Sequence, residues 1–296
     1  MVLLLSHFLR ALRWKMLIEP LGYNPSTTLV FSGVMIGYLA NLIVPRMGEV
    51  TRCGVLNRRQ GIPVDKLLGT VITERIADLA VLLLLMILVF FIKLKLVAYF
   101  FKTQILAGLV LKGHSQGPLL IKASIIVIIL MAMALFFYRR KKDIILDLAP
   151  VKIVKKFISG IWAGSKTIGK IKHSWLFYSL SLIIWTLYAI STALVFYALD
   201  ATSHLAFSDA LFVLCAGSLG MVAPVQGGIG AYHFMVTQAL FLLGIAKDEG
   251  LAYATINHSS QLLLFLVVGG GCLVAVLLKK RRIEPLNSQP NMIPAK

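Results

Sequence analysis

Residues 210–246 read ALFVLCAGSLGMVAPVQGGIGAYHFMVTQALFLLGIA, a run of 37 residues without a charged side chain. A single helix of this length would measure about 55 Å at about 1.5 Å per residue, whereas the hydrocarbon core of a membrane is about 30 Å thick. Pro224 and the glycines that follow it also interrupt a regular helix. We therefore expect a re-entrant pair, 210–223 and 230–246, with its tip buried in protein. A pair of short tilted helices is the alternative.

The composition of the whole chain excludes a water-soluble globule. Of its 296 residues, 58% are hydrophobic and 14% are charged, and the mean hydropathy is +0.86. Soluble domains carry about 25% charged residues. Lys and Arg number 30 against 12 acidic residues, a formal net charge of +18. Because the basic residues flank apolar runs, this charge indicates membrane flanks rather than nucleic-acid binding. The three cysteines predict neither a disulfide framework nor a metal motif.

Apolar segments along the chain predict an all-α, polytopic membrane protein. A second broken pair is expected at 26–60, where Pro45 and Gly48 interrupt the apolar run as Pro224 does in the other pair. Arg10, Arg13 and Trp14 end the first helix, and we interpret them as an interfacial flank. Together this gives seven to eight apolar segments, with two broken pairs and about five full spans. The expected spans are 1–18, 67–92, 119–138, 175–199 and 253–278.

The distribution of charge predicts the orientation of these segments. The loop 139–174 carries ten basic and two acidic residues and is expected to be cytoplasmic, as is the basic cluster at 279–282. The two broken pairs then enter from opposite sides. Pro45 and its neighbours also overlay on Pro224 and its neighbours, which suggests an inverted repeat. We expect one membrane domain, 1–282, and a disordered cytoplasmic tail, 283–296. Four lysines remain on the outer side: Lys93, Lys95, Lys102 and Lys112.

A first cluster of charged residues follows Pro45. On a helix that begins there, Glu49 lies three residues from both Arg46 and Arg52, so its carboxylate can pair with either guanidinium. The arginine left free would suit a lipid phosphate near the helix start. A solvated group of charges beside the membrane is the alternative.

A second cluster contains Glu74, Arg75 and Asp78. Glu74 and Asp78 lie four residues apart on one helix face, where two carboxylates repel unless a cation or a proton joins them. An arginine of the first cluster, or Arg58, could supply the cation. We interpret the cluster as an ion-pair network that lines a polar cavity, with proton coupling as the alternative. The chain offers no further ligands for a metal, so we expect neither a metal nor another cofactor.

The glycine-rich break contributes a third group of candidate residues. Its glycines allow the backbone to approach a ligand closely, and the free amides of the next helix start favour an anionic head group. His233 could carry a proton there or serve only in packing. In the last span, Asn257, His258 and Gln261 predict interhelical hydrogen bonds. The candidate residues of the break are Gln226, Gly227, Gly228, Gly230 and His233.

Four stretches occur in a characteristic order: Arg10-Ala11-Leu12-Arg13-Trp14, Asn41-Leu42-Ile43-Val44-Pro45-Arg46-Met47-Gly48-Glu49-Val50-Thr51-Arg52, Glu74-Arg75-Ile76-Ala77-Asp78 and Pro224-Val225-Gln226-Gly227-Gly228-Ile229-Gly230. In this order the chain resembles the membrane domain of the lysylphosphatidylglycerol synthase family, also called the flippase-like domain family. The resemblance implies a multi-pass inner-membrane protein, in a family with members linked to translocation of aminoacylated phospholipids or of polyprenol- and hopanoid-related lipids. Only fourteen residues follow Arg282, too few for the soluble aminoacyltransferase domain, so lipid aminoacylation is not expected.

Together these features predict a flippase-like protein, not an enzyme, that binds an anionic phospholipid or polyprenyl-type lipid and translocates it across the inner (plasma) membrane. Arg46 and Arg52 would meet the lipid phosphate, and the three carboxylates Glu49, Glu74 and Asp78 would hold them in place. We expect membrane lipids as partners, with either a homo-oligomer or a separately encoded lipid-modifying enzyme. Two alternatives stay open: a membrane enzyme that uses Glu74 and Asp78, and a non-catalytic partner of a separate transferase.

Overall fold

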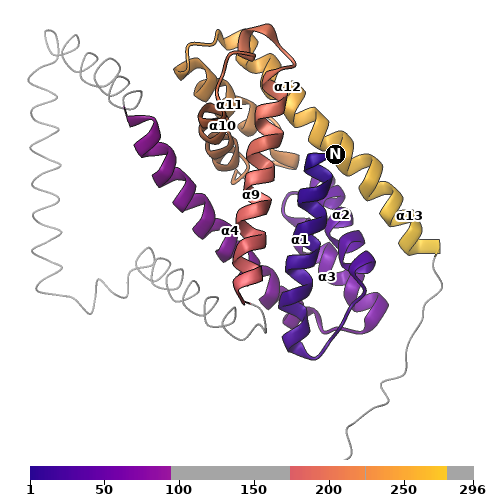
Figure 1. Ribbon diagram of the computed structural model, residues 1–296. Helices are drawn as coiled ribbons and strands as arrows, with labels where there is room; N and C mark the ends of the chain where they lie inside the picture. The colour runs from indigo at the N-terminus through magenta and orange to yellow at the C-terminus, as the bar shows by residue number, and fades with distance from the viewer. Residues whose placement is uncertain (95–173, 224, 279–296) are drawn as a thin grey trace, which may run out of the picture.

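The computed structural model describes residues 1–94, 174–223 and 225–278 (Figure 1). The expected span 119–138, Pro224, the tail 283–296 and all of the basic loop except Ser174 lie outside the described residues. Every regular element within these ranges is helical. In chain order the α-helices are α1 Val2–Ile18, α2 Thr27–Ile43, α3 Met47–Gln60, α4 Val64–Ile92, α9 Ser174–Phe196, α10 Phe207–Gly220, α11 Ala231–Leu242, α12 Lys247–Leu264 and α13 Gly270–Leu278. Short 3-10 helices lie at Glu19–Leu21, Asp200–Thr202 and Gln226–Gly228.

Three of the described segments are long and apolar enough to cross a membrane: α4, α9 and the continuous helix Lys247–Leu278. Two shorter helices, α2 and α10, are also apolar. The second half of α4 packs against α9 and α10 through Leu82 and Val89, whereas other apolar side chains there, such as Leu84 and Phe91, are largely exposed. Lys93 follows α4 and forms an ion pair with Asp209 on α10, with Nζ 2.6 Å from Oδ1. One of the four lysines expected on the outer side therefore has a carboxylate partner.

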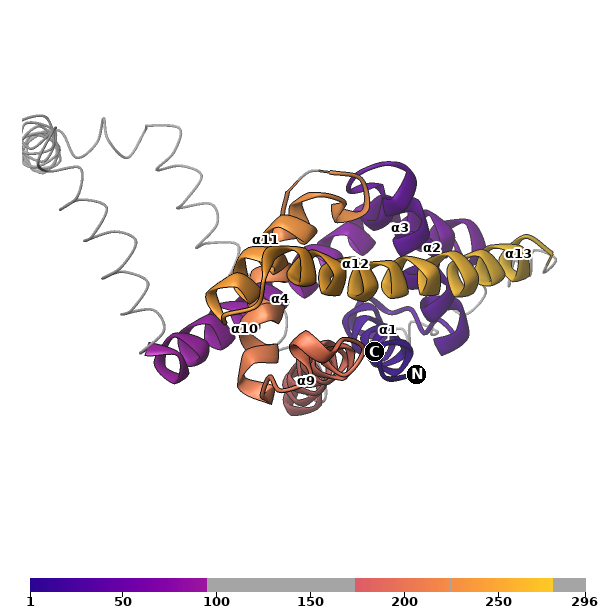
Figure 2. The same cartoon turned by 90° about the horizontal axis from the view of Figure 1, so that it is seen from above.

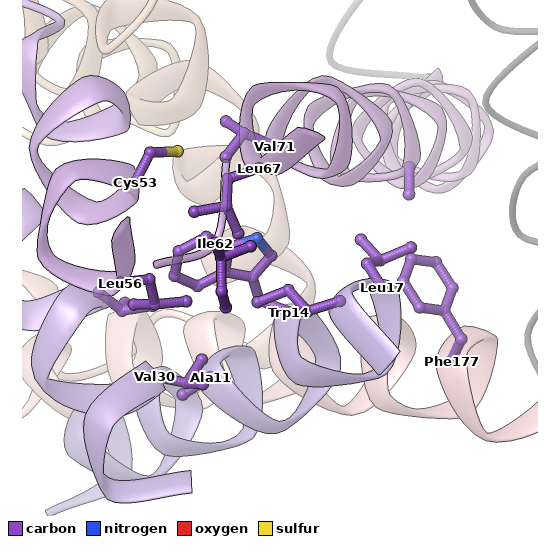
Figure 3. Close-up of a cluster of buried hydrophobic side chains, with 13 residues drawn as sticks. Ala11, Trp14, Leu17, Val30, Cys53, Leu56, Ile62, Leu67, Val71 and Phe177 are labelled. Carbon is purple, nitrogen blue, oxygen red and sulfur yellow. The ribbon is translucent and has the colours of Figure 1, made fainter. Parts of the chain in front are cut away.

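The N-terminal half packs around Trp14. Ala11, Trp14 and Leu17 lie three residues apart on α1 and share its buried face. Figure 3 shows the indole of Trp14 surrounded by side chains from α3 and α4. Its Nε1 donates to Thr70 Oγ1 at 2.9 Å, so the buried polar atom of this ring is satisfied. This packing fixes the face of α1 on which Arg10 and Arg13 also lie.

A second cluster of buried side chains joins α9, α10, α11 and α12, with Tyr253 at its centre. The Tyr253 hydroxyl donates to the Thr192 carbonyl on α9 at 2.7 Å. Phe196 packs against the same ring at 5.2 Å between centroids. The C-terminal half therefore has its own packed centre, separate from that around Trp14.

The last span joins the two halves. α12 packs on α11, whereas α13 and the π-helix Phe265–Gly269 between them pack on α2. Figure 2 shows this long helix running past both pairs. The contact with α2 is close, because a Cβ on Gly269 would lie 2.8 Å from the Met35 carbonyl oxygen. Glycine at this position thus allows the two backbones to meet.

The chain is broken at both places that the sequence predicts. In the first break, residues 44–46, α2 ends at Ile43 and Arg46 adopts a left-handed conformation with φ 63° before α3 begins. In the second break, residues 221–230, α10 ends at Gly220 and the chain passes through Gly227, Gly228 and Gly230, all with positive φ, before α11.

Gly48 is not part of the first break, contrary to expectation. It lies in the first turn of α3. A Cβ there would collide with the Gly37 carbonyl of α2, and it would come within 2.6 Å of Asn41 Nδ2. Gly48 therefore permits close packing of α2 against α3 rather than a bend.

Candidate functional site

Five charged side chains from α1, α3 and α4 meet between the helices and form what we call the charge cluster: Arg10, Arg13, Arg52, Glu74 and Asp78. Glu74 is fully buried at its centre. Its Oε1 lies 2.7 Å from Arg10 Nε, and its Oε2 lies 2.8 Å from Arg52 Nη1. Each buried carboxylate is thus shared between arginines, which offsets the loss of hydration.

Asp78 completes the charge cluster one helical turn further along α4. It binds both arginines of α1: Oδ2 pairs with Arg10 Nη2, and Oδ1 lies 2.6 Å from Arg13 Nη2. The four-residue spacing of Glu74 and Asp78 on α4 matches the three-residue spacing of Arg10 and Arg13 on α1. The two carboxylates of α4, which repel each other, are therefore held by the two arginines of α1.

Helix α9 adds neutral hydrogen-bonding groups to the charge cluster. Arg10 Nη1 donates to the Tyr188 hydroxyl at 3.2 Å, and Arg13 Nη1 donates to Ser181 Oγ at 2.9 Å. Arg52 is held differently, because its guanidinium lies over the Trp14 ring at 4.4 Å from the centroid. A cation stacked on an indole face is stabilised by the ring quadrupole. All three arginines are therefore fixed in position.

A pocket opens beside the charge cluster. Its walls come from α1, α2, α3 and α4, and it encloses about 230 Å³ including its open mouth. The interior is narrow, with room for about one water molecule. We call it the polar pocket. Its lining residues are Arg10, Val34, Gly37, Tyr38, Asn41, Gly48, Glu49, Arg52 and Arg75.

The two breaks touch each other through a reciprocal exchange of hydrogen bonds. Arg46 Nη2 of the first break donates to the Val222 carbonyl of the second at 3.2 Å. Gln226 Nε2 of the second break donates to the carbonyl of Ile43, the last residue of α2, at 3.3 Å. In the sequence, Ile43 and Val222 each lie two residues before the proline of their segment. Each break thus donates to the carbonyl two residues before the proline of the other.

Helix α12 fastens the second break from the other side. The Gly227 carbonyl lies 2.9 Å from His258 Nε2, and the Tyr232 hydroxyl accepts from Asn257 Nδ2 at 2.8 Å. The Tyr232 and His258 rings stack at 4.8 Å between centroids. The predicted hydrogen bonding of the last span to a neighbouring helix is confirmed for Asn257. Gln261 bonds to Asn257 within the same helix, at 3.4 Å.

His233 lies at the start of α11, where its Nδ1 accepts the Gly230 N–H at 3.3 Å. Its ring lies 5.0 Å from that of His258 and is only partly buried. This contact satisfies one of the amides that a helix start leaves free. Of the break residues, Gly228 is buried, whereas Gln226 and Gly230 are exposed.

The structure corrects the interpretation of Arg10 and Arg13. They are not an interfacial flank, because both are buried in the charge cluster and neither exposes more than 6% of its surface. A flank and a buried ion-pair face have the same composition, so an arginine near the end of an apolar helix does not distinguish them. The signal that could have found them is their three-residue spacing, together with an unpaired Glu74 and Asp78 elsewhere in the chain.

The expected partners of Glu49 are also wrong. Glu49 Oε1 pairs with Arg75 Nη2 at 2.7 Å, on the more exposed side of the polar pocket. Of the arginines proposed as the cation for Glu74 and Asp78, Arg52 does pair with Glu74, while Arg46 bonds to the second break and Arg58 is exposed. Sequence spacing alone places neighbours on one helix, whereas these contacts join different helices.

The charge cluster does not resemble a metal centre. Among residues 1–94, 174–223 and 225–278, no group of three or more His, Cys, Asp or Glu side chains could hold a metal ion. Both carboxylates of the charge cluster bind arginines instead.

Comparisons with known proteins agree with this architecture. A family model described as the lysylphosphatidylglycerol synthase TM region matches residues 1–269. A similar protein is the UPF0104 membrane protein MJ1595 of Methanocaldococcus jannaschii, which is 36% identical over 74 residues. That alignment covers 24% of this chain and 22% of the relative's length. No solved structure matches the chain significantly. The family match and the apolar helices make this a multi-pass membrane protein.

Proposed function

Because this chain belongs to the lysylphosphatidylglycerol synthase transmembrane-region family, we propose that it binds an anionic phospholipid or lipid-linked substrate and translocates it across the plasma membrane. This is a carrier function rather than an enzymatic one. The loop 139–174 and the C-terminus face the cytoplasm in this proposal, because basic residues are retained on that side.

One observation carries the proposal: a pocket lined by three arginines lies between helices of a membrane protein, beside buried ion pairs. Charged side chains buried among membrane helices are costly, and they often mark the pathway of a polar or charged substrate. The charge cluster holds Arg10 and Arg52 in place, while the polar pocket gives a head group access to them. The acyl chains would stay in the lipid.

The contact between the two breaks supports the same function. Broken helices whose tips meet inside the membrane are typical of transporters, where they surround the substrate site. Here Arg46 and Gln226 tie the tips together, and the polar pocket is too narrow for a phosphate group. We take this arrangement as a closed state, from which the first broken pair must move to admit a head group.

A lipid-flipping assay in reconstituted vesicles tests this function. Protein is inserted into phosphatidylcholine vesicles that contain a trace of fluorescent phosphatidylglycerol, and a membrane-impermeant quencher is added outside. We expect quenching to continue beyond the outer-leaflet fraction in vesicles with protein. The same rate in protein-free vesicles would contradict translocation.

The site is tested in the same assay with Arg52→Ala, which should slow flipping strongly, because Arg52 lines the polar pocket. The matched control is Arg58→Ala, which removes the same charge from an exposed position on the same helix. Equal rates for the wild type and Arg52→Ala would contradict the assignment of the site. Thermal melting of each purified variant in detergent shows that it is folded.

A further inference from the structure

The three buried arginines of the charge cluster differ in how many of their donors are used. Arg10 has partners on Nε, Nη1 and Nη2. Arg13 uses both Nη atoms. Arg52 forms one ion pair, between its Nη1 and Glu74 Oε2. Its Nε and Nη2 are buried and have no hydrogen-bond partner among the described residues.

These two free atoms of Arg52 form a matched pair. Nε–H and Nη2–H lie on the same edge of the planar guanidinium and point in parallel, which is the edge that binds two oxygens of one anion. Arg52 exposes only 4% of its surface, stacks on Trp14 and lines the polar pocket. A buried donor pair without an acceptor is costly, and a ligand that supplies two oxygens would remove that cost.

The charge count sets how much negative charge this ligand carries. The charge cluster contains three arginines against Glu74 and Asp78, which leaves one positive charge in excess. Glu49 and Arg75, which also line the polar pocket, neutralise each other. A ligand with one negative charge balances the site. A diphosphate would bring more negative charge than the site offsets, and its surplus would be uncompensated in a region of low dielectric.

The geometry of the lining favours a tetrahedral anion. Besides Arg52 on α3, the lining includes Tyr38 and Asn41 on α2. Asn41 uses its Oδ1 to accept the Gly48 N–H at 2.7 Å, so its amide nitrogen remains as a donor. Donors from two helices surround a tetrahedral group better than a flat carboxylate, whose oxygens lie in one plane.

We infer that the polar pocket binds one phosphodiester monoanion through the Nε–Nη2 edge of Arg52, and so selects phosphodiester lipids over polyprenyl diphosphates. This inference rests on the proposed function for its lipid source, and it narrows the two substrate classes left open there to one. Binding requires α2 and α3 to separate at Gly37 and Gly48, because the closed pocket is smaller than a phosphate group.

Native mass spectrometry of the full chain in mild detergent tests the inference by binding, without transport. The protein is mixed with equal amounts of phosphatidylglycerol, a polyprenyl diphosphate, oleate and diacylglycerol. We expect one phosphatidylglycerol per chain as the main adduct of the wild type. A preference for the diphosphate or for oleate, or adducts of equal abundance with all four, would overturn the inference.

The role of Arg52 is tested with Arg52→Lys, which keeps the charge next to Glu74 but loses the two-donor edge. We expect phosphatidylglycerol binding to weaken about tenfold, since a bidentate contact becomes a single one. Arg58→Gln, an exposed position on the same helix, should bind as the wild type does. Equal binding by the wild type and a folded Arg52→Lys would overturn the assignment, and the lipid preference of the wild type remains decisive if this variant does not fold.

A soluble phosphodiester, glycerophosphorylglycerol, identifies the source of the ligand. Weak competition by it supports a bilayer lipid, whereas competition equal to that of phosphatidylglycerol overturns the lipid source and keeps the phosphodiester site. The proposed function can fail separately. Selective binding without flipping would contradict translocation alone, and flipping that does not depend on Arg52 would contradict this inference alone.

Discussion

The two breaks reverse the chain by different means and have different neighbours. The first break turns at Arg46, a non-glycine residue whose backbone is in the left-handed conformation, and leads into the charged helix α3. The second break turns through three glycines and is held by neutral groups, Tyr232 and His258. Ionic contacts cluster beside one break and neutral hydrogen bonds beside the other. In the function that we propose, this difference places head-group binding at the first pair.

Removing the charge at the centre of the first pair should have the largest effect. Glu74→Gln leaves Arg10, Arg13 and Arg52 buried with Asp78 as their one carboxylate. Breaking a buried ion pair costs about 3–5 kcal/mol in stability. We expect a large drop in the melting temperature of the detergent-solubilised protein. Glu49→Gln, which affects a more exposed pair, is the matched control, and equal drops for the two variants would show that burial does not set the strength of these contacts.

Glycine-to-alanine substitutions near each break distinguish two roles of glycine, close helix packing and a positive φ. Gly48→Ala places a Cβ against the Gly37 carbonyl, so α2 and α3 must shift, at a cost of about 1–3 kcal/mol. Gly230→Ala meets no neighbour within 4 Å but must hold φ near 84° and ψ near −59°, a sparsely populated conformation that costs about 1–3 kcal/mol.

We expect Gly48→Ala to alter phosphatidylglycerol binding as well as stability, because Gly48 lines the polar pocket, and Gly230→Ala to alter stability alone. Denaturation and native mass spectrometry measure the two effects. Gly54→Ala on α3, which also meets nothing within 4 Å, should leave binding unchanged and raise stability by up to about 1 kcal/mol, because alanine has the higher helix propensity. A loss of binding in Gly230→Ala would argue that the second break also holds the head group.

The reciprocal hydrogen bonds between the breaks should have the smallest effect on stability. Both are exposed, so Gln226→Ala should cost about 1 kcal/mol or less. If these bonds hold a closed state, the same variant should flip lipid faster than the wild type in reconstituted vesicles. Gln238→Ala, a partly buried glutamine on α11, controls for the loss of an amide. A slower rate in Gln226→Ala would contradict a role in closure.

The sequence was sufficient for features that depend on local chemistry. Proline interrupts a regular helix, so breaks near Pro45 and Pro224 could be predicted, and the ordered stretches of sequence predicted the family correctly. Two carboxylates on one helix face favour a nearby cation, so the sequence could predict that Glu74 pairs with an arginine, although not with which ones.

The contacts between distant residues could not be predicted in the same way. Arg10 meets Glu74 across 64 positions, and Arg46 meets Val222 across 176. Both contacts depend on which helix faces pack together, and that follows from the burial of residues such as Trp14 rather than from any spacing in the sequence. The open edge of Arg52 is visible only once the partners of all three arginines are known.

The π-helix Phe265–Gly269 has a mechanical consequence for the last span. It lies between the part of the span that packs on α11 and the part that packs on α2. A π turn departs from the regular hydrogen-bond ladder and is a place where a long helix bends. One continuous helix therefore packs against both broken pairs, and we expect a relative tilt of the two pairs to bend this helix at Phe265–Gly269.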